Sequence, residues 1–349
     1  MAKIESIRIR EVVRPLKTLF ATALGKKAFL QNIFVSVALD NGNTGTGEIP
    51  TSFSRKDETI PVIRKALEQM RDELKGVPIE TYEERIRDLR KRFPHARMTI
   101  SGLEVALFRA FLKSKGASER QWFGGKLDEL ETDITIPFVP DAASLTKWID
   151  YALREGFRLF KIKVSGDVED DKRFLSLTRG ILARSEIPFR MRLDGNQGYK
   201  VTTFCRFADW IRTKGYPVDF FEQPLPKRDL EGLRTVRKAA VLPIILDESV
   251  DTISDVKRAL DEEACDGVNI KIAKSGITES LEIVQLARIN GLKLMIGCMT
   301  ETMVGLSAGI HLAAGTGSFG YVDLDSIYFL HHRNRYGDIL LDGPRLSIV

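Results

Sequence analysis

Short apolar runs alternate with longer amphipathic segments through most of the chain after Thr132. Runs such as Ile244-Ile245-Leu246 are apolar on both faces, as strands buried in a parallel sheet are. The segments between the runs repeat apolar residues at helical spacing, as over residues 143–155. Strands alternating with helices predict an α/β fold whose parallel sheet closes as a (β/α)8 barrel. The predicted strands cover residues 132–137, 159–164, 188–194, 218–222, 242–247, 267–272, 292–298 and 319–323.

The first part of the chain has a different order of elements. Residues 3–13 and 31–39 alternate like strands, and Asn41-Gly42 is a hairpin signal. Helical periodicity follows over residues 57–75, 80–91 and 100–115. Strands followed by helices predict a small α+β domain. We therefore expect an α+β domain over 1–125, the barrel over 126–332, and a tail, 333–349, that packs back on the first domain.

Composition narrows the class of protein. The 349 residues are 43% hydrophobic, which suits a globular protein with an ample core, and the net charge of +5 is spread along the chain in both signs. This charge hints weakly at an anionic ligand and gives no case for nucleic acid. Three distant cysteines without a CxxC motif favour a reducing cytoplasm. The N-terminus has no apolar core of a signal peptide, and we expect no membrane span.

Polar residues close most of the predicted strands. A (β/α)8 barrel collects the carboxyl ends of its strands on one face, so these side chains are expected to meet there. Seven such residues follow one another at intervals of 24 to 31 residues: Lys163, Asp194, Glu222, Asp247, Lys271, Cys298 and Asp323.

Three lysines are predicted to point into the barrel. Lys161 and Lys163 share one face of their strand, because side chains alternate along a strand. A solvated edge strand is the alternative, which the apolar flanks disfavour. Lys271 faces inward on the sixth strand, opposite the second, and it can also neutralise Asp247. Burial and the like charge of the neighbouring ammonium lower a lysine pKa, so we expect Lys161 and Lys163 to have the lowered pKa of useful bases.

Three carboxylates close successive strands between these lysines. For each of Asp194, Glu222 and Asp247 taken alone, a helix cap is the better interpretation. Together they would repel one another strongly, and a hard divalent cation resolves this repulsion. Oxygen ligands favour Mg²⁺, and the lack of histidine or cysteine argues against zinc. A Schiff-base aldolase using Lys163 would leave the three carboxylates unexplained.

The last two strands offer weaker signals. Cys298 is a lone thiol, which is more often packing than chemistry. Asp323 and Asp325 are spaced so that both carboxylates point the same way, and they can bind an ammonium group. Helix capping is a serious alternative for this pair.

Five motifs together resemble the enolase superfamily, in its muconate-lactonizing subgroup. The motifs are Lys161-Ile162-Lys163, Asp194-Gly195-Asn196, Glu222-Gln223-Pro224, Asp247-Glu248-Ser249 and Asn269-Ile270-Lys271. The resemblance covers nearly the whole chain, including an N-terminal capping domain. Within the subgroup, Asp323-Leu324-Asp325 is similar to the motif of the dipeptide epimerases typified by L-Ala-D/L-Glu epimerase. Ile134-Thr135-Ile136 and Gly297-Cys298-Met299 fit the same branch.

The resemblance implies a reaction and a set of roles. It implies an isomerase that moves a proton at the α-carbon of a dipeptide's C-terminal residue through an enediolate. Lys163 and Lys271 would be the acid/base pair, with Lys161 supporting Lys163. Asp194, Glu222 and Asp247 would bind Mg²⁺. Asp323 and Asp325 would hold the α-ammonium, and Thr135 and Cys298 would line the substrate site.

One segment departs from the pattern of the Ala-Glu epimerases. Thr22-Ala23-Leu24 aligns with the loop that covers the substrate, and an arginine follows this triplet in those enzymes. Here Gly25 stands at that position, followed by Lys26 and Lys27. Either lysine can substitute for the arginine, although lysine lacks its bidentate fork. We therefore expect Gly25 and Lys26 at the substrate and a C-terminal residue other than glutamate.

Other reactions of the subgroup use the same five motifs. They are those of o-succinylbenzoate synthase, N-acylamino acid racemase and cycloisomerase. Asp323 and Asp325 distinguish a dipeptide epimerase from these enzymes, because the substrates of the other reactions carry no ammonium group. A non-catalytic metal-binding scaffold is a further alternative, which the opposed lysines disfavour. Side-chain preference, the lysine that serves each epimer and the formation of a homo-oligomer stay open.

Overall fold

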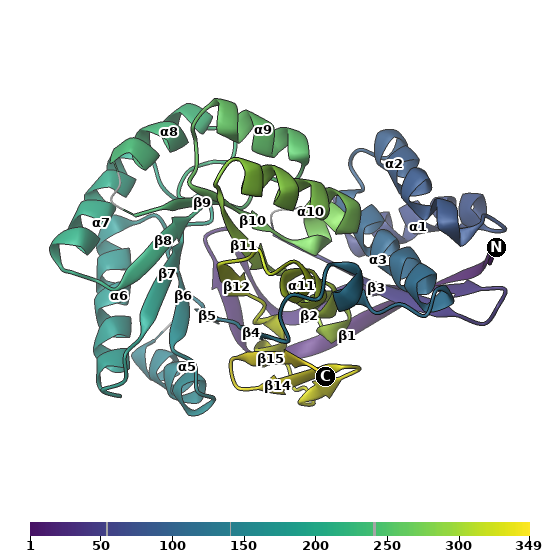
Figure 1. Ribbon diagram of the computed structural model, residues 1–349. Coiled ribbons are helices and arrows are strands. Elements are labelled where there is room, and N and C mark those ends of the chain that lie inside the picture. Colours follow the sequence, from purple (N-terminus) through teal and green to yellow (C-terminus); the bar gives the residue numbers. More distant parts are fainter. Residues whose placement is uncertain (54, 140, 240–241) are drawn as a thin grey trace.

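The computed structural model describes residues 1–53, 55–139, 141–239 and 242–349 and confirms the predicted α/β fold (Figure 1). The main sheet has eight strands in the order β12-β11-β10-β9-β8-β7-β6-β5, and its neighbouring strands are parallel. Each strand falls within a predicted run. The strands are β5 (Ile134–Ile136), β6 (Leu159–Lys163), β7 (Arg190–Asp194), β8 (Val218–Glu222), β9 (Ile244–Leu246), β10 (Gly267–Ile270), β11 (Lys293–Gly297) and β12 (Tyr321–Asp323).

Helices on the outside connect consecutive strands. A 3₁₀ turn, η2 (Ser326–Phe329), follows β12 where an unmodified barrel would place a helix. None of the helices among the described residues is both long and apolar enough to cross a membrane. The connecting helices are α5 (Ala142–Arg154), α6 (Val168–Ala183), α7 (Val201–Thr213), α8 (Leu230–Ala239), α9 (Ile253–Asp261), α10 (Ile272–Ile289) and α11 (Met303–Thr316).

The barrel closes between β5 and β12 through a short seam. The Asp133 N–H donates to Val322 O at 3.1 Å, and the Leu324 N–H donates to the Thr132 hydroxyl at 2.8 Å. The buried Arg192 guanidinium reaches the same place from β7, with Nη1 2.8 Å from Val322 O. Side-chain bonds therefore supplement backbone bonds where the sheet meets itself.

The N-terminal domain consists of an antiparallel sheet covered by helices. Its strands, in the order β1-β2-β3, are β1 (Ile4–Thr22), β2 (Gly25–Leu39) and β3 (Thr44–Pro50). Gly45 and Gly47 of β3 let helix α3 approach closely, because an added Cβ would lie 2.0 Å from a helix carbonyl oxygen. The helices are α1 (Ile60–Leu74), η1 (Ile79–Thr81), α2 (Tyr82–Arg92), α3 (Arg97–Ser114) and α4 (Glu119–Trp122).

Strands β1 and β2 extend well beyond the predicted residues 3–13 and 31–39. They pair as far as Thr22 and Gly25, with an irregularity between Pro15 and Phe20. The alternation of apolar residues fades in this outer half, because the hairpin leaves the core and reaches the open end of the barrel. Sequence periodicity reports burial, so it could not detect this extension.

Two buried acids of the first domain bond the starts of barrel helices or helical segments, among other polar contacts between the two parts. Glu48 accepts hydrogen bonds from Thr302 N, Thr302 Oγ1 and Gly305 N at the start of α11. Glu104 of α3 accepts bonds from Thr278 N and Oγ1 in α10. Each acid thus satisfies backbone donors of a barrel helix from the other domain.

The C-terminal tail joins a second small sheet. Its order is β13-β14-β15-β4, with β4 (Glu129–Glu131), β13 (Arg335–Tyr336), β14 (Ile339–Asp342) and β15 (Arg345–Ile348). The tail therefore pairs with the link that leads into the barrel. Tyr336 and Asp338 also line a pocket with Arg109 of α3, so the tail reaches the first domain as well. The domain boundaries themselves stay a prediction.

Candidate functional site

The predicted polar residues meet at the carboxyl ends of the barrel strands. Lys163, Asp194 and Glu222 stand side by side in the register of β6, β7 and β8. Asp247 and Lys271 follow β9 and β10 directly. All five side chains are buried. One cavity is lined by Lys161, Lys163, Asn196, Asp247, Glu248 and Lys271.

Lys161 lies at the centre of the acids. Its Nζ is 2.6 Å from Asp323 Oδ2, 2.7 Å from Glu222 Oε2 and 3.2 Å from Asp194 Oδ2. Burial would lower the pKa of this ammonium, but the three carboxylates hold it well above its ordinary value. The lowering expected for Lys161 is therefore wrong, because carboxylates outnumber the lysines around it.

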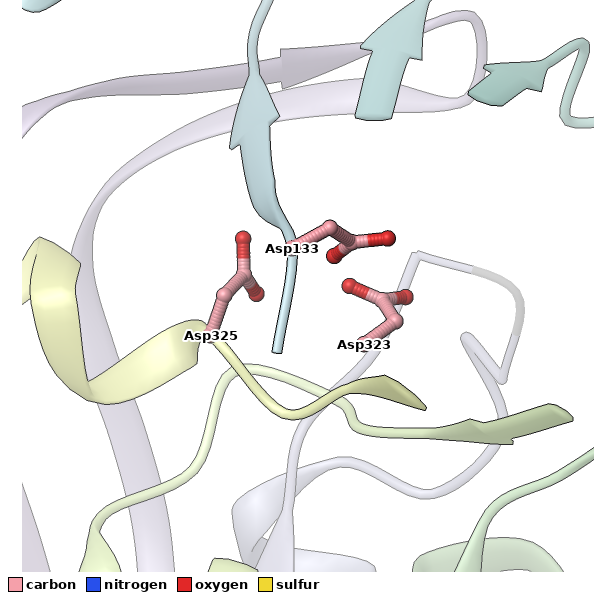
Figure 2. Close-up of side chains that lie close together, drawn as sticks. All are labelled: Asp133, Asp323 and Asp325. Atoms are coloured by element: carbon pink, nitrogen blue, oxygen red, sulfur yellow. The ribbon is translucent and has the colours of Figure 1, made fainter. Parts of the chain in front are cut away.

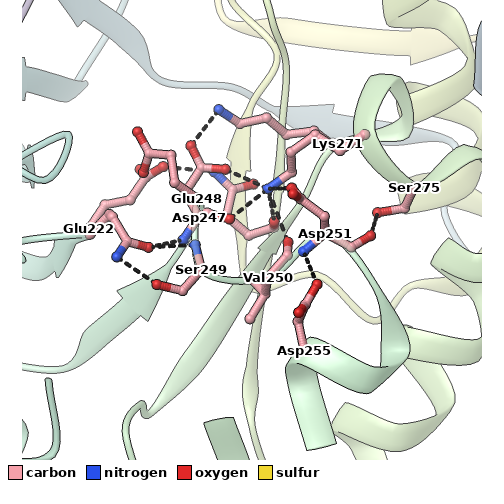
Figure 3. Close-up of polar contacts among 12 residues, drawn as sticks. Glu222, Asp247, Glu248, Ser249, Val250, Asp251, Asp255, Lys271 and Ser275 are labelled. Atoms are coloured by element: carbon pink, nitrogen blue, oxygen red, sulfur yellow. Dashed lines mark hydrogen bonds and ion pairs between the residues drawn. The ribbon is translucent and has the colours of Figure 1, made fainter. Parts of the chain in front are cut away.

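Lys163 and Lys271 hold opposite sides of the cavity. Lys163 Nζ is 2.5 Å from Asp194 Oδ2. Lys271 Nζ is 2.7 Å from Asp247 Oδ2, and Figure 3 shows this second pair. Their strands, β6 and β10, are four positions apart in a ring of eight, so they face each other. Burial opposes the charge of Lys271, yet Asp247 raises its pKa above the ordinary value. The pairing of Lys271 with Asp247 is the one that the sequence allowed.

The acid group between the lysines has free oxygen atoms. Among the described residues, the buried Glu248 Oε2 and Asn196 Oδ1 accept no hydrogen bond, whereas Glu222 Oε2 is paired with the Lys161 ammonium. Burial and the neighbouring carboxylates Asp247 and Asp194 raise the pKa of Glu248 to about 8. Unpartnered buried oxygens are costly, and a cation would satisfy them. The donor set is all oxygen, which fits Mg²⁺.

Lys274 is a buried residue that sequence reasoning missed. Its Nζ lies 2.6 Å from Asp247 Oδ1 and 2.7 Å from the Asp247 carbonyl oxygen. Burial raises the pKa of Asp247, but Lys271 and Lys274 together hold it below its ordinary value. Lys274 follows Lys271 by three residues, so helical spacing at the end of β10 was the available signal.

A second acid group lies beside β5 and β12. Carboxylate oxygens of Asp133, Asp323 and Asp325 lie within 4.8 Å of one another (Figure 2). Sequence reasoning missed Asp133, which precedes β5 and pairs with Arg192 at 2.6 Å. Burial, Asp323 and Asp325 raise the Asp133 pKa well above its ordinary value. Arg192 and Lys161 already bond two of these acids. The remaining negative charge therefore suits a singly charged ammonium group better than a divalent metal ion.

Thr135 and Cys298 flank this second group. The Thr135 N–H donates to Asp325 Oδ2 at 2.5 Å, and Cys298 Sγ is 3.9 Å from Asp325 Oδ1. Burial and Asp323 raise the Asp325 pKa to about 6. Asp323 and Asp325 both line the cavity, as do Thr135 and Cys298. The structure thus brings these four predicted residues together.

The tip of the β1–β2 hairpin covers the cavity. Phe20, Thr22, Leu24 and Lys27 line it, while Gly25 and Lys26 do not. Lys26 is exposed. Residues 25 and 27 share one face of the strand, and residue 26 lies on the other. Of the two lysines considered for this loop, the structure therefore brings Lys27 and not Lys26 to the site.

Comparison with known proteins agrees with this geometry. A family model described as "Enolase C-terminal domain-like" matches residues 145–344. The chain is 34% identical over 325 residues to L-Ala-D/L-Glu epimerase of Thermotoga maritima, covering 91% of this chain and 90% of the relative. It is 31% identical to the hydrophobic dipeptide epimerase of Citrifermentans bemidjiense, covering 97% and 94%.

A solved structure is also similar over nearly the full length. It is a dipeptide epimerase from Methylococcus capsulatus complexed with Mg and the dipeptide L-Arg-D-Lys. The TM-score is 0.89 at 28% identity, covering 99% of this chain and 97% of that one. The names of these relatives differ in the dipeptide side chains that they specify.

Proposed function

Because the chain belongs to the enolase superfamily, we propose that it is a Mg²⁺-dependent dipeptide epimerase. The reaction is a 1,1-proton transfer at the α-carbon of the C-terminal residue of a dipeptide. The observation that carries this proposal is the pair of opposed lysines, Lys163 on β6 and Lys271 directly after β10, with the carboxylates of Asp133, Asp323 and Asp325 beside them.

The two lysines supply the proton transfer. Lys163 and Lys271 reach the central acids from opposite walls, at 2.5 Å and 2.7 Å from Asp194 and Asp247. An α-carbon held between them exposes one face to each lysine. One lysine, in its neutral form, removes the proton, and the other, as an ammonium, returns one to the opposite face. The configuration is thereby inverted, which a single base cannot do.

Asp194, Glu222 and Asp247 would hold the metal ion, with Glu248 and Asn196 close to it. When bound, Mg²⁺ supplies the positive charge that stabilises the anion formed on proton removal. Lys161 keeps the Asp194 and Glu222 carboxylates in place from below, since its Nζ contacts both. Lys274 does the same for Asp247.

The second acid group would bind the substrate ammonium. Asp323 and Asp325 face the cavity, and Asp133 adds a third carboxylate behind them. A free α-ammonium neutralises this group, whereas an acylated or succinylated nitrogen leaves it unpaired and buried. This contrast favours a dipeptide over the substrates of N-acylamino acid racemase, o-succinylbenzoate synthase or a cycloisomerase.

The test is exchange of the α-proton in D2O over a library of dipeptides, with Mg²⁺ added. We expect deuterium at the C-terminal α-carbon together with inversion, and loss of both after treatment with EDTA. Lys163→Ala and Lys271→Ala should each abolish inversion, and each should retain exchange of only one epimer. Lys172→Ala, on the outer helix α6, is the matched control. A library in which no member exchanges would refute the proposal and leave a non-catalytic scaffold.

A paired variant separates the reactions of the subgroup. Asp323→Asn with Asp325→Asn should abolish turnover of free dipeptides, because the ammonium loses its counter-charge. If dipeptide turnover survived this change, the substrate class would be wrong even though the barrel chemistry stood.

A further inference from the structure

One wall of the cavity remains to contact the side chain of the substrate's C-terminal residue. In the proposed reaction the carboxylate faces the metal ligands, and the α-proton faces a lysine. The amide nitrogen leads to the N-terminal residue, whose α-ammonium faces Asp323 and Asp325. The floor below is filled by Lys161, which is 1% exposed. The fourth substituent of the α-carbon therefore points towards the first domain, whose β1–β2 hairpin closes the cavity.

This wall carries aromatic and aliphatic side chains, a few hydroxyl groups and one charged side chain. The hairpin contributes Phe20, Thr22, Leu24 and Lys27, and Phe53 and Phe329 stand nearby in the same cavity. Lys27 Nζ lies 5.6 Å from the centre of the Phe53 ring. Gly25 makes room for that ring, because an added Cβ would lie 2.9 Å from Phe53. The hairpin thus places a single ammonium group, Lys27, above an aromatic surface.

The ammonium of Lys27 lacks a strong partner. Its hydrogen bond to Thr51 O is long, at 3.4 Å, and Lys27 forms no ion pair with another described residue. Burial lowers the Lys27 pKa to about 8, although Glu301 and Cys298 oppose the lowering. A desolvated cation of this kind costs free energy unless a bound group neutralises it. Since the cation faces the substrate, the substrate can provide that group.

We infer that Lys27 is a specificity residue that selects a C-terminal residue with a carboxylate side chain, such as glutamate. The inference rests on the proposed epimerase function and names its substrate class. It replaces the expectation, drawn from the missing arginine after Leu24, that glutamate is disfavoured. The lysine stands two positions further along the strand, on the same face as the residue it replaces. Apolar neighbours such as Leu24 and Phe53 suit the two methylenes of glutamate.

The experiment compares neighbouring lysines. Lys27→Met removes the charge inside the cavity, and Lys26→Met makes the same change on the exposed face of the same strand. Both variants and the unchanged protein are assayed with L-Ala-L-Glu, L-Ala-L-Gln and L-Ala-L-Met, which are similar in length. Circular dichroism confirms that each variant is folded, and Lys27→Arg tests whether a cation alone is sufficient.

We expect the unchanged protein and Lys26→Met to prefer L-Ala-L-Glu over L-Ala-L-Gln. Lys27→Met should lower kcat/KM for L-Ala-L-Glu by roughly 10- to 100-fold, because a charge-assisted bond is lost. The loss should appear mainly in KM, and turnover of L-Ala-L-Met should be kept or increased. Lys27→Arg should keep the preference.

Two results would overturn the inference. One is a preference of the unchanged protein for L-Ala-L-Met over L-Ala-L-Glu. The other is equal behaviour of Lys27→Met and Lys26→Met towards L-Ala-L-Glu. Both results leave an active epimerase, so they differ from failure of the proposed function, in which no dipeptide would exchange its α-proton.

Discussion

At the scale of single residues, buried lysines hold the acids of the site in place. Lys274 does not line the cavity that holds Lys163 and Lys271. Its Nζ nevertheless bonds both a carboxylate oxygen and the carbonyl oxygen of Asp247. Lys161 likewise bonds Asp323, on the substrate side, while contacting Glu222 on the metal side. These two lysines therefore determine where the acids lie as well as how they titrate.

Replacing Lys274 by methionine should destabilise the protein. Lys274 is 2% exposed, and its removal leaves part of the buried charge of Asp247 uncompensated. We expect a loss of about 3–5 kcal/mol in the free energy of unfolding, measured with urea. Lys257→Met, at an exposed position on α9, is the control. Equal stabilities of the two variants would show that Lys274 is dispensable.

The buried charge of Lys27 gives stability a dependence on pH. Its pKa is about 8 in the folded protein, while that of an unfolded lysine is about 10.4. Between these values the unfolded chain binds more protons, so this group makes stability rise with pH. Lys27→Met should therefore stabilise the protein at pH 7, by about 1–3 kcal/mol. The gain should shrink at pH 10, and urea unfolding at both values measures it.

Strand parity made much of the site predictable. Alternation along β6 placed Lys161 and Lys163 on the inner face, and the ends of β7 and β8 placed Asp194 and Glu222 beside them. Contacts between strands far apart in the sequence were not predictable in this way. The pair of Arg192 with Asp133 joins β7 to the residue before β5, and its formation depends on how the barrel closes.

At the scale of elements, the positions of Asp323 and Asp325 depend on the seam between β5 and β12. Leu324 lies between Asp323 and Asp325, and its N–H donates to the hydroxyl of Thr132. A shift of this short segment would move both acids, because they flank the bonded residue.

Thr132→Val tests the seam with little change in volume. The variant leaves the buried Leu324 N–H without its acceptor, which should cost about 1–3 kcal/mol. It should also raise KM for dipeptides, because Asp323 and Asp325 would be less well held. Thr146→Val in α5 is the control, since its hydroxyl bonds only the preceding helical turn. If both variants had the same stability and the same KM, the seam would have no part in binding.

The element types were predictable and some lengths were not. All eight barrel strands lie within predicted runs, since each run is apolar and ends at a charged or polar residue or a turn signal. The outer half of the β1–β2 hairpin was missed because its side chains line a cavity or face solvent. Such positions need no alternation of apolar residues, and the pattern therefore carries no signal there.

At the scale of the whole molecule, the two parts share buried polar joints. Glu104 accepts two bonds from Thr278 of α10 and pairs with Arg90, and Glu48 caps α11. Gly276 interrupts α10 at this joint with a φ of 72°. A side chain there would collide with Glu104, since an added Cβ would lie 2.0 Å from its Oε2. The first domain and the barrel are thus fitted to each other.

We expect the two parts to unfold in one transition. Trp122 reports on the first domain, and Trp148 reports on the barrel. Variants in which Trp122 or Trp148 is the single tryptophan, with Trp210 also replaced, should give coincident urea transitions. Glu104→Ala should shift both transitions to lower urea by an equivalent amount, whereas the exposed Glu84→Ala should shift neither. Separate transitions for the two tryptophans would contradict a shared folding unit.

The long β1–β2 hairpin has a consequence for how such a protein can diverge. Its tip touches the substrate wall, while the joints at Glu48 and Glu104 lie elsewhere and the reacting groups belong to the barrel. Recombination of a gene segment for residues 14–30 would therefore exchange the hairpin tip that contacts the substrate side chain. It would leave the residues for proton transfer unchanged. Descendants of one ancestor can in this way come to act on different dipeptides through changes confined to a single ribbon.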